Sequence, residues 1–349
     1  MNKAKTIYVN ARFLTQAPTG VQRYAFEVCV QMKKIRPDIV FVAPKNIYSK
    51  DQAGQLDAVC IGWGSGYFWE QIELPLYLKR KGSPPLLSPA NTGPLFYRNQ
   101  FLTLHDLAFI HYPGHFSGLF VRVYHFLIPR LLQRIRHVFT VSQTVSREIA
   151  HHFPNTRGRI TVTYNGLSVA FQNYFQKSKS IQKEKQILMV GSFNLRKNYA
   201  VAIEGFLSAK LNHYTLNIIG HHQNIFTSDT LPGSDKVKFW ESVSDEALFE
   251  AYEKAEIFIS LSVYEGFGIP VLEAIAAGCK VVCSDIPVYQ ELFSGNVYFC
   301  PSNDAAELAD CLKKVISDSN MKPNSVSLDP KFDYKQSAMQ IIDTIEQNS

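Results

Sequence analysis

The sequence predicts an α/β protein with two Rossmann-like, doubly wound domains, and three observations support this. Short apolar runs alternate with helical patterns between residues 6 and 141. A second alternation of the same kind begins at Gln186. Between the two lies a polar and charged stretch that is typical of a linker. A chain of 349 residues is long enough for two domains with full hydrophobic cores.

These patterns predict four segments. We expect a first domain over residues 1–170, a linker over 171–185, a second domain over 186–330 and a terminal helix within 331–349. The first domain is expected to hold strands at 6–10, 39–42, 58–61, 86–87, 101–104 and 137–141, and the second at 186–191, 215–220, 237–239, 257–261, 280–284 and 297–299.

Composition limits the class of protein. Apolar residues make up 46% and charged residues 19% of the chain, which is typical of a globular protein. No run reaches the ~18 apolar residues that a membrane span requires, and the first residues do not resemble a signal peptide, so we expect a cytoplasmic protein. The six cysteines show neither a Cys-x-x-Cys pair nor a zinc-binding spacing. We therefore expect buried small residues there and no metal site.

Charge is distributed unevenly along the chain. Residues 1–170 carry 20 Lys and Arg against 8 Asp and Glu, a net charge of +12, and residues 171–349 carry 16 against 22, a net charge of −6. A basic first half indicates an anionic partner such as a lipid diphosphate or an anionic membrane surface. The helical segment 117–136 mixes arginines with apolar residues and is interrupted by Pro129. It could lie on such a membrane, or its apolar residues could face the core.

The most informative stretch lies between residues 257 and 278. An apolar run, 257–261, reads as a buried strand, and a turn with Gly266 and Gly268 follows it. Pro270 suits the start of a helix, which should end at Gly278. A strand, a glycine turn and a helix start place backbone N–H groups at a positive helix terminus, which is an anion site.

Two acids flank this turn. Glu265 and Glu273 should avoid phosphates and instead accept hydrogen bonds from sugar or ribose hydroxyls. Arg196 and Lys197 follow the end of another predicted strand, where two cations could neutralise a diphosphate. A ligand with a sugar at one end, a diphosphate in the middle and a ribose at the other fits this set, and that ligand is a nucleotide sugar.

Several motifs, taken in order along the chain, resemble those of glycosyltransferase family four, whose members are retaining enzymes with the GT-B fold. The resemblance covers nearly the whole chain. It rests on residues 19–24, 105–106, 140–142, 164–166, 191–198, 243–248 and 262–274. The resemblance implies a GT-B fold, in which two Rossmann-like, doubly wound domains face each other across a cleft, and a terminal helix that crosses back to the first domain.

The resemblance also implies roles for individual residues. Glu265 would hold the donor sugar, Glu273 the ribose, and Arg196 with Lys197 the departing diphosphate. His105 would line the donor-sugar pocket from the first domain, unless it is simply a histidine satisfied by its neighbours. The predicted catalytic residues are Glu265, Arg196, Lys197 and His105, and the predicted donor-binding residues are Gly20, Gly191, Ser192, Gly266, Phe267, Gly268, Ile269 and Glu273.

Two further residues are candidates for the acceptor or a phosphate. Arg23 lies one helical turn after Gly20 and is either a phosphate ligand or an exposed helix charge. Asp106 either caps a helix or orients a neighbour. No cofactor and no metal are expected, because the nucleotide sugar is a substrate and the resemblance implies a metal-free diphosphate site.

The implied function is hexosyl transfer in cell-surface polysaccharide synthesis, as for O-antigen, capsule or exopolysaccharide. GDP-mannose is the leading donor, and dTDP-rhamnose, GDP-fucose and UDP-N-acetylglucosamine are the alternatives. The acceptor would be a lipid-diphosphate-linked or free oligosaccharide, and the enzyme could be peripheral on the inner face of the cytoplasmic membrane. A GT-B nucleotide-sugar epimerase and an inactive sugar-nucleotide-binding protein remain as other classes. A nucleic-acid partner is not expected, because no aromatic-basic motif is present.

Overall fold

The computed structural model describes residues 5–178, 182–220, 234–318 and 329–349. The chain divides into two compact units: unit 1 comprises Met1–Asn165 and Asp333–Ser349, and unit 2 comprises Gly166–Phe332. Each unit has its own parallel sheet with helices on both faces, so the predicted doubly wound α/β fold is confirmed for both. No described helix has the length and apolar character needed to cross a membrane.

The sheet of unit 1 has seven described strands in the order β3-β2-β1-β4-β5-β6-β7, all paired in parallel. The strand order reverses between β1 and β4, so the connections from these two strands leave toward opposite sides. The strands are β1 (Tyr8–Asn10), β2 (Val40–Ala43), β3 (Val59–Cys60), β4 (Leu86–Ser88), β5 (Gln100–Thr103), β6 (His137–Thr140) and β7 (Ile160–Val162).

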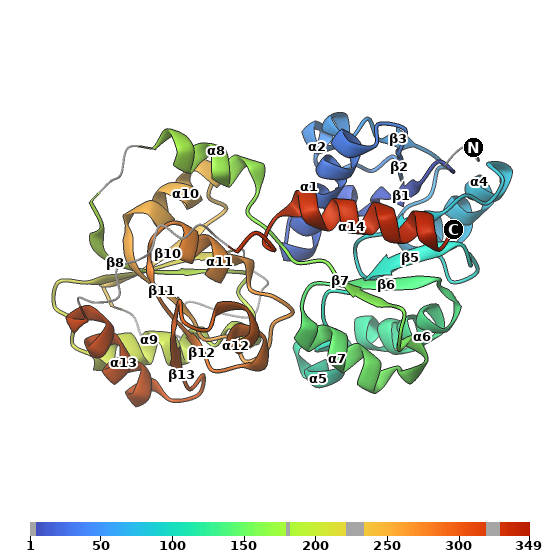
Figure 1. Cartoon of the computed structure of the whole chain (residues 1–349). Helices are drawn as coiled ribbons and strands as arrows, with labels where there is room; N and C mark the ends of the chain where they lie inside the picture. The colour runs from blue at the N-terminus through green and yellow to red at the C-terminus, as the bar shows by residue number, and fades with distance from the viewer. Residues whose placement is uncertain (1–4, 179–181, 221–233, 319–328) are drawn as a thin grey trace. The chain divides into compact units, whose positions relative to one another are not determined.

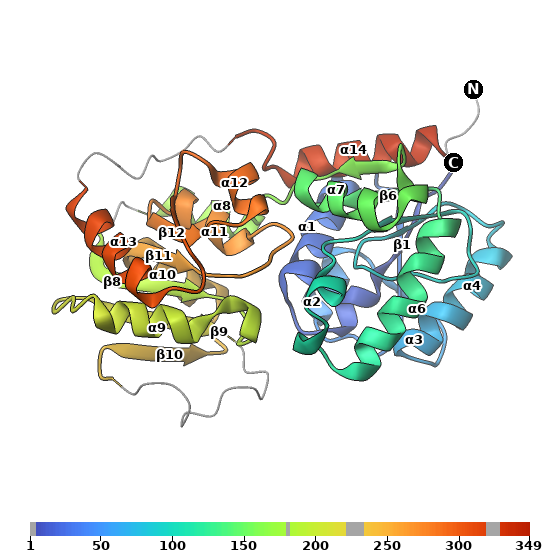
Figure 2. The ribbon, with the colours of Figure 1, turned by 90° about the horizontal axis from the view of Figure 1, so that it is seen from below.

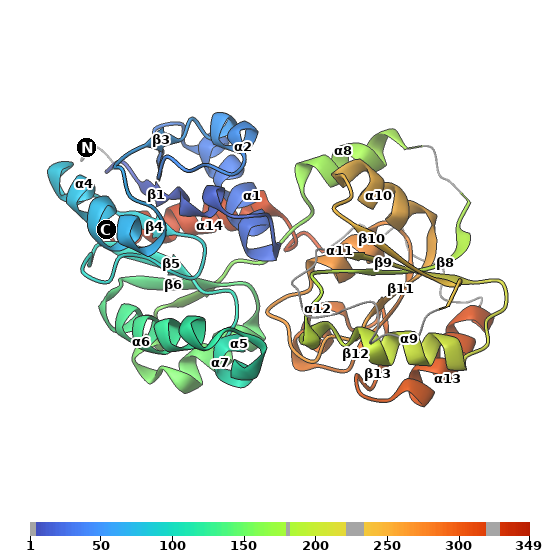
Figure 3. The same cartoon turned by 180° about the vertical axis from the view of Figure 1, so that it is seen from behind.

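Helices cover both faces of this sheet. Helices α1 and α14 lie on one face, and α5, α6 and α7 lie on the other (Figures 1 and 3). The helices of unit 1 are α1 (Gly20–Ile35), α2 (Lys50–Gln55), α3 (Gly66–Phe68), α4 (Leu74–Arg80), α5 (Ala108–His111), α6 (Gly118–Arg134), α7 (Gln143–His152) and α14 (Tyr334–Gln347), with a π-helical turn at Trp69–Glu73 and 3₁₀ turns at Ala11–Thr15, Pro113–His115 and Pro154–Thr156.

The last helix belongs to the first unit, although unit 2 precedes it in the chain. Helix α14 packs along α1. Its Ser337 hydroxyl donates to the carbonyl of Tyr164 over 2.7 Å, and Glu346 near its end accepts from Arg36 over 2.5 Å. The buried side of α14 is apolar, with Ala338, Ile341, Ile342 and Ile345 among its members.

The sheet of unit 2 has six described strands in the order β10-β9-β8-β11-β12-β13, again all parallel, and its order reverses between β8 and β11. The strands are β8 (Glu184–Val190), β9 (Thr215–Gly220), β10 (Val237–Glu241), β11 (Ala255–Ser260), β12 (Lys280–Ser284) and β13 (Tyr298–Cys300).

Helices α9 and α13 pack together on one face of this sheet, and α8, α10 and α11 cover the other (Figures 1 and 2). The helices of unit 2 are α8 (Val169–Lys177), α9 (Tyr199–Ser208), α10 (Asp245–Lys254), α11 (Ile269–Ala276), α12 (Pro287–Phe293) and α13 (Ala305–Ser317), with a 3₁₀ turn at Leu195–Lys197. Helix α11 ends before Gly278, which has a φ of 75°, as its sequence predicts.

Three expectations differ from the structure. Residues 171–177 of the expected linker belong to helix α8 (Val169–Lys177), because Phe171 is buried against Phe249 at a ring separation of 5.2 Å. Residues 179–181 of that linker lie outside the described residues. Pro129 does not interrupt α6, whose buried residues Leu127, Ile128, Leu131 and Leu132 pack on both sides of it. Strand β7 was not expected, since its three residues form no distinct apolar run.

Candidate active site

The loops that follow β8 and β11 meet where the strand order of unit 2 reverses. The N–H of Val263, after β11, donates to the carbonyl of Arg196, after β8, over 2.9 Å. Beside this backbone contact, Lys197 Nζ donates to Glu265 Oε1 over 2.6 Å. Ligands of open α/β sheets bind at the carboxyl ends of strands at such a reversal. Three of the four predicted catalytic residues are therefore brought together by unit 2.

Glu265 is ionised by its cationic neighbours. Burial is the largest influence on its pKa and would raise it, but Lys197 and Arg196 together outweigh burial and lower the pKa below its usual value. The side chains of Lys197 and Glu265 are only 16% and 19% exposed. The hydroxyls of Tyr199 and Tyr289 are also close enough for the Glu265 charge to raise their pKa values, after burial as the main cause.

The turn after Glu265 holds an unusual backbone conformation. Gly268 has a φ of 104°, and an added Cβ would lie 2.5 Å from Cε1 of Tyr289, so glycine is needed for both reasons. Gly268 precedes helix α11, and its carbonyl accepts from Val271 and Leu272. The N–H groups of Phe267, Gly268 and Ile269 have no acceptor among the residues that the structure describes. Such N–H groups at a helix start suit an anion.

The side chain of Phe267 has a separate role, because it is buried against Phe293 and Phe332 at ring separations of 6.1 and 5.7 Å. Only its backbone can face a ligand. Gly266 is also buried.

Glu273 lies in helix α11 and is 2% exposed. Its Oε2 accepts from the Tyr252 hydroxyl over 2.9 Å. Tyr252 comes from α10, so the carboxylate also joins two helices on the same face of the sheet. The sequence did not indicate this partner, because Tyr252 is 21 residues away.

Gly191, Asn194 and Asn198 determine the conformation of the loop that follows β8. An added Cβ on Gly191 would lie 3.0 Å from Cε of Lys197, so Gly191 lets the lysine cross the strand end. The Ser192 hydroxyl accepts from Asn194 Nδ2 over 2.9 Å. Asn198 does not cap α9 with its side chain: it adopts a left-handed conformation with a φ of 55° and donates to the carbonyl of Ser302.

The fourth predicted catalytic residue, His105, follows β5 in unit 1. It is 6% exposed, and its Nε2 lies 2.9 Å from the carbonyl of Pro89. Because a carbonyl only accepts, Nε2 carries the proton, which leaves Nδ1 as the nitrogen available to a substrate. Burial lowers the pKa of His105, so the ring is neutral. Its ring also meets the Tyr24 ring edge-on at 4.8 Å.

The remaining predicted residues also lie in unit 1. Asp106 Oδ1 accepts from the N–H of Ala108, the first residue of the short helix α5, over 2.9 Å, although Leu107 holds the N-cap position. Gly20 is the exposed first residue of α1, after the N-cap residue Thr19. Arg23 lies in the first turn of α1, and its N–H donates to the carbonyl of Thr19 over 2.9 Å.

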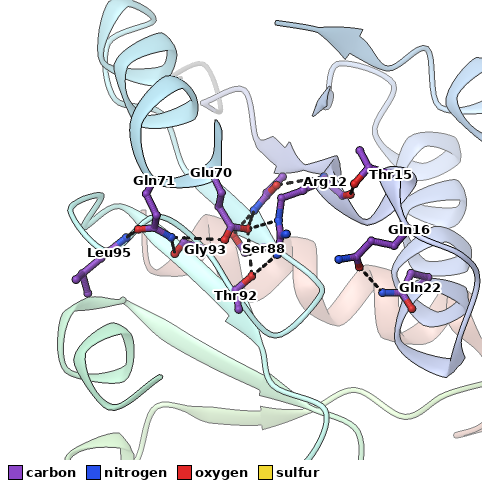
Figure 4. A network of polar contacts seen from close by, with 11 residues as sticks. Arg12, Thr15, Gln16, Gln22, Glu70, Gln71, Ser88, Thr92, Gly93 and Leu95 are labelled. Carbon is purple, nitrogen blue, oxygen red and sulfur yellow. Dashed lines mark hydrogen bonds and ion pairs between the residues drawn. The ribbon is translucent and has the colours of Figure 1, made fainter. Parts of the chain in front are cut away.

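Unit 1 also holds polar residues that the sequence did not single out. Arg12, Glu70 and Thr92 form a hydrogen-bonded network near the ends of β1 and β4 (Figure 4). They are separated by 58 and 22 residues, and no motif links them. Across the described ranges, no group of three or more His, Cys, Asp and Glu side chains is arranged to hold a metal ion.

Comparison with known families accounts for most of the chain. Residues 170–327 match the family described as "Glycosyl transferases group 1", and residues 84–171 match "Glycosyltransferase Family 4". The O-antigen chain mannosyltransferase RfbU of Salmonella typhimurium strain LT2 is 31% identical over 262 residues, covering 72% of this chain and 70% of RfbU.

Solved structures share the fold. WaaG, a glycosyltransferase involved in lipopolysaccharide biosynthesis, superposes with a TM-score of 0.69 at 15% identity, covering 97% of this chain and 95% of WaaG. A sucrose-phosphate synthase from Thermosynechococcus elongatus gives a TM-score of 0.71 at 15% identity, covering 99% of each chain. These solved structures show that the chain has the GT-B fold. The family matches and the similarity to RfbU show that the chain belongs to the family four, or group 1, glycosyltransferases.

Proposed function

We propose that this glycosyltransferase moves mannose from GDP-mannose to a lipid-linked or saccharide acceptor during the synthesis of a cell-surface polysaccharide, with retention of the anomeric configuration. Enzymes of this family use a nucleotide-sugar donor and a sugar acceptor. The mannosyl choice is supported by the 31% identity to an O-antigen chain mannosyltransferase. O-antigen, capsule or exopolysaccharide would each be a suitable product.

The observation that carries the proposal is the Lys197–Glu265 pair at the reversal between β8 and β11. Lys197 and Arg196 would stabilise charge on the departing diphosphate, together with the N–H groups of Phe267 to Ile269. Glu265, kept ionised, would accept hydrogen bonds from hydroxyls of the donor sugar. Glu273 would accept from the ribose. These assignments supply cations for the phosphates and carboxylates for the hydroxyls.

The transfer step needs no protein nucleophile. The bond between the anomeric carbon and the diphosphate oxygen breaks, and the acceptor oxygen bonds to the same face of that carbon. The acceptor's proton passes to an oxygen of the departing diphosphate. The products are the glycoside and the nucleoside diphosphate, and an α-linked donor gives an α linkage. NMR measurement of the anomeric couplings tests this, because an inverted product would require a general base on the opposite face, for which His105 is a candidate.

The donor is tested with a panel of GDP, UDP, dTDP and their sugars. A ligand present at 100 times its Kd should add about 2.7 kcal/mol to the free energy of unfolding, which a thermal-shift assay detects. We expect the largest shift with GDP-mannose. A larger shift with dTDP-rhamnose, GDP-fucose or UDP-N-acetylglucosamine would reassign the donor. Conversion of the nucleotide sugar to its epimer would instead indicate the epimerase class, and binding without any turnover would indicate an inactive protein.

Nucleotide binding is proposed to require no metal, because Arg196 and Lys197 supply the positive charge. Calorimetric titration of GDP in the presence of a chelator should give the same affinity as titration with magnesium. If binding is lost in chelator and returns with magnesium or manganese, a metal takes part and this assignment is wrong.

The basic first half is proposed to recruit an anionic membrane surface or a lipid diphosphate. On α6, Leu119 and Phe126 are 74% and 54% exposed, and the Arg130 guanidinium lies 3.9 Å from the centre of the Phe126 ring. Each basic residue near an anionic leaflet contributes about 1 kcal/mol, and salt screens this attraction. Sedimentation with anionic liposomes should therefore decrease at high salt. Equal binding to neutral and anionic vesicles would contradict this role.

A further inference from the structure

The ends of β1 and β4 hold a polar network that the proposed donor site does not use (Figure 4). Asn10 is the last residue of β1 and Ser88 the last of β4, and the strand order of unit 1 reverses between these two strands. A crevice forms outside the carboxyl ends of strands at such a reversal, and ligands bind there in open α/β sheets. Unit 1 therefore has a second ligand position of the kind that unit 2 has.

Glu70 is the centre of this network. Its Oε1 accepts from Arg12 Nε over 2.9 Å, from Asn10 Nδ2 over 2.8 Å and from the Thr92 hydroxyl over 3.2 Å. Arg12 also donates from Nη2 to Thr92 over 2.7 Å. The side chains of Arg12 and Glu70 are 12% and 1% exposed. The arginine is thus held in one orientation from several sides.

Folding stability does not explain why this ion pair is buried. A buried ion pair often adds nothing to stability compared with apolar residues of the same size, because both charges lose their water. Glu70 also lies in a π-helical turn, Trp69–Glu73, and such turns are frequent at functional sites. Both features point to a role in binding rather than in folding.

The chemistry of the Arg12 guanidinium and the Tyr67 ring indicates the class of ligand. Glu70 neutralises Arg12, so the pair offers hydrogen bonds without the net positive charge that would select a phosphate. Arg12 Nη1 has no partner among the described residues. The Tyr67 ring lies 5.1 Å from the guanidinium and is 40% exposed. N–H donors beside a partly exposed aromatic ring suit a neutral sugar ring, whose hydroxyls accept and whose C–H groups pack on aromatic carbon.

We propose that Arg12 and Tyr67 bind a neutral pyranose ring of the acceptor, and that Glu70 is a positioning residue that orients Arg12 for this contact. This inference rests on the proposed function, since it assigns the acceptor side of the same reaction.

The test compares Arg12→Lys with Arg36→Lys in the full chain. Arg36 is the control: its side chain is also 12% exposed and it also pairs with carboxylates, Asp38 at 3.0 Å and Glu346 at 2.5 Å, but it follows the far end of α1. The probes are the methyl pyranosides of mannose, galactose, rhamnose and N-acetylglucosamine, observed by saturation-transfer NMR. We expect at least one to bind the wild type and Arg36→Lys, and to bind Arg12→Lys at least about tenfold more weakly.

A second variant tests the positioning role. Glu70→Gln keeps the shape of the side chain but removes its charge, so the Arg12 charge is no longer neutralised. The variant should lose affinity for the pyranoside and gain affinity for inorganic phosphate. A merely structural Glu70 would change neither, provided that thermal melting shows both variants folded.

Several outcomes would overturn the inference: no pyranoside binds the wild type, both arginine variants bind equally well, or the wild type prefers phosphate. Calorimetric titration of GDP separates this failure from failure of the proposed function. Unchanged GDP binding in Arg12→Lys is expected. If the wild type binds no nucleotide, the proposed function fails, and if only Arg12→Lys loses GDP binding, Arg12 belongs to the donor site.

Discussion

Each of the two sheets carries a cation–carboxylate pair where its strand order reverses, and the two pairs differ in their surroundings. In unit 1, Arg12 follows β1, and Glu70 receives hydrogen bonds from four side chains while remaining 1% exposed. In unit 2, Lys197 and Glu265 are joined over 2.6 Å and are 16% and 19% exposed. The two cations are about equally buried, but the carboxylate is almost enclosed in unit 1 and more accessible in unit 2.

The difference follows from the side chains. Arginine presents a rigid fork that several acceptors can hold, whereas lysine is a flexible point charge. Arg12 is therefore suited to a fixed contact with a ligand that does not change charge. Lys197 can turn from Glu265 toward a phosphate when negative charge develops there. Under the proposed roles, the pair that orients a ligand contact combines arginine with a carboxylate that is 1% exposed, and the pair at the reacting centre combines lysine with one that is 19% exposed.

Removal of the enclosed carboxylate should have the largest effect on stability. Glu70→Ala would leave Arg12 without its counter-charge in a nearly buried place, which costs about 3–5 kcal/mol. Glu265→Ala should cost clearly less, because Lys197 can turn to water. Urea unfolding followed by tryptophan fluorescence measures the free energy of unfolding of both variants. Equal losses in the two variants would show that the pairs do not differ as their burial indicates.

Removal of the accessible carboxylate should have the largest effect on activity. Glu265→Gln should lower the rate of transfer by about 10²–10³-fold, since one polar contact made in the transition state is worth this much. Its affinity for GDP should remain, because the carboxylate contacts the sugar in the proposed site. Glu273→Ala should weaken GDP binding instead. Calorimetry and a transfer assay measure both, and equal losses of GDP affinity in the two folded variants would mean that the two ends of the donor are assigned incorrectly.

Two glycine-to-alanine variants, one in each unit, distinguish the cost of a left-handed backbone from the cost of a steric clash. Gly268→Ala places a Cβ at a φ of 104° and 2.5 Å from Tyr289, whereas Gly66→Ala, at a φ of 56°, meets nothing within 4 Å. Gly66→Ala should cost about 1–2 kcal/mol, from the left-handed backbone alone. Gly268→Ala should cost more and should also weaken GDP binding. Thermal melting of both variants decides this, and an equal or reversed order would show that Tyr289 moves aside readily.

Acidification should lower the stability of the two units in different pH ranges. The loss between pH 7 and pH 6 is the smallest of the predicted effects. Burial lowers the pKa of His105, and burial with the Arg159 charge lowers the pKa of His137 from 6.5 to about 4. The unfolded chain therefore takes up these protons first, and unit 1 loses stability as the pH falls below 6.5. From pH 7 to pH 6 the loss should be less than about 1 kcal/mol per histidine.

Glu265 in unit 2 has the opposite sign of charge but the same direction of stability change. Its pKa is lowered, so its contribution is complete above the usual value of 4.5 and is lost only as the pH falls below it. Unit 1 should thus respond to acid first. Melting curves of wild type and His137→Asn between pH 7 and pH 4 test this, and an unchanged pH dependence in the variant would exclude His137 as a cause.

Much of the fold follows from local patterns. The run 257–261, the glycine turn and Pro270 predict β11, the loop and α11, because the apolar period, the left-handed glycine and the helix start all agree over a short stretch. Residues 171–177 of helix α8 were assigned to the linker together with the polar, charged stretch that follows them, because burial of Phe171 depends on α10, far along the chain. Local patterns fail where a distant partner decides whether a residue is buried.

The sequence by itself determined the α/β class, the family and the glycine turn with its two acids, because these depend on residues that are close together in the chain. Only the tertiary structure decided which charges meet. Lys197 and Glu265 are 68 residues apart, and Arg12 and Glu70 are 58 apart. Parallel strands bring such residues to one sheet edge through helical crossovers, and no local signal records which loops become neighbours there.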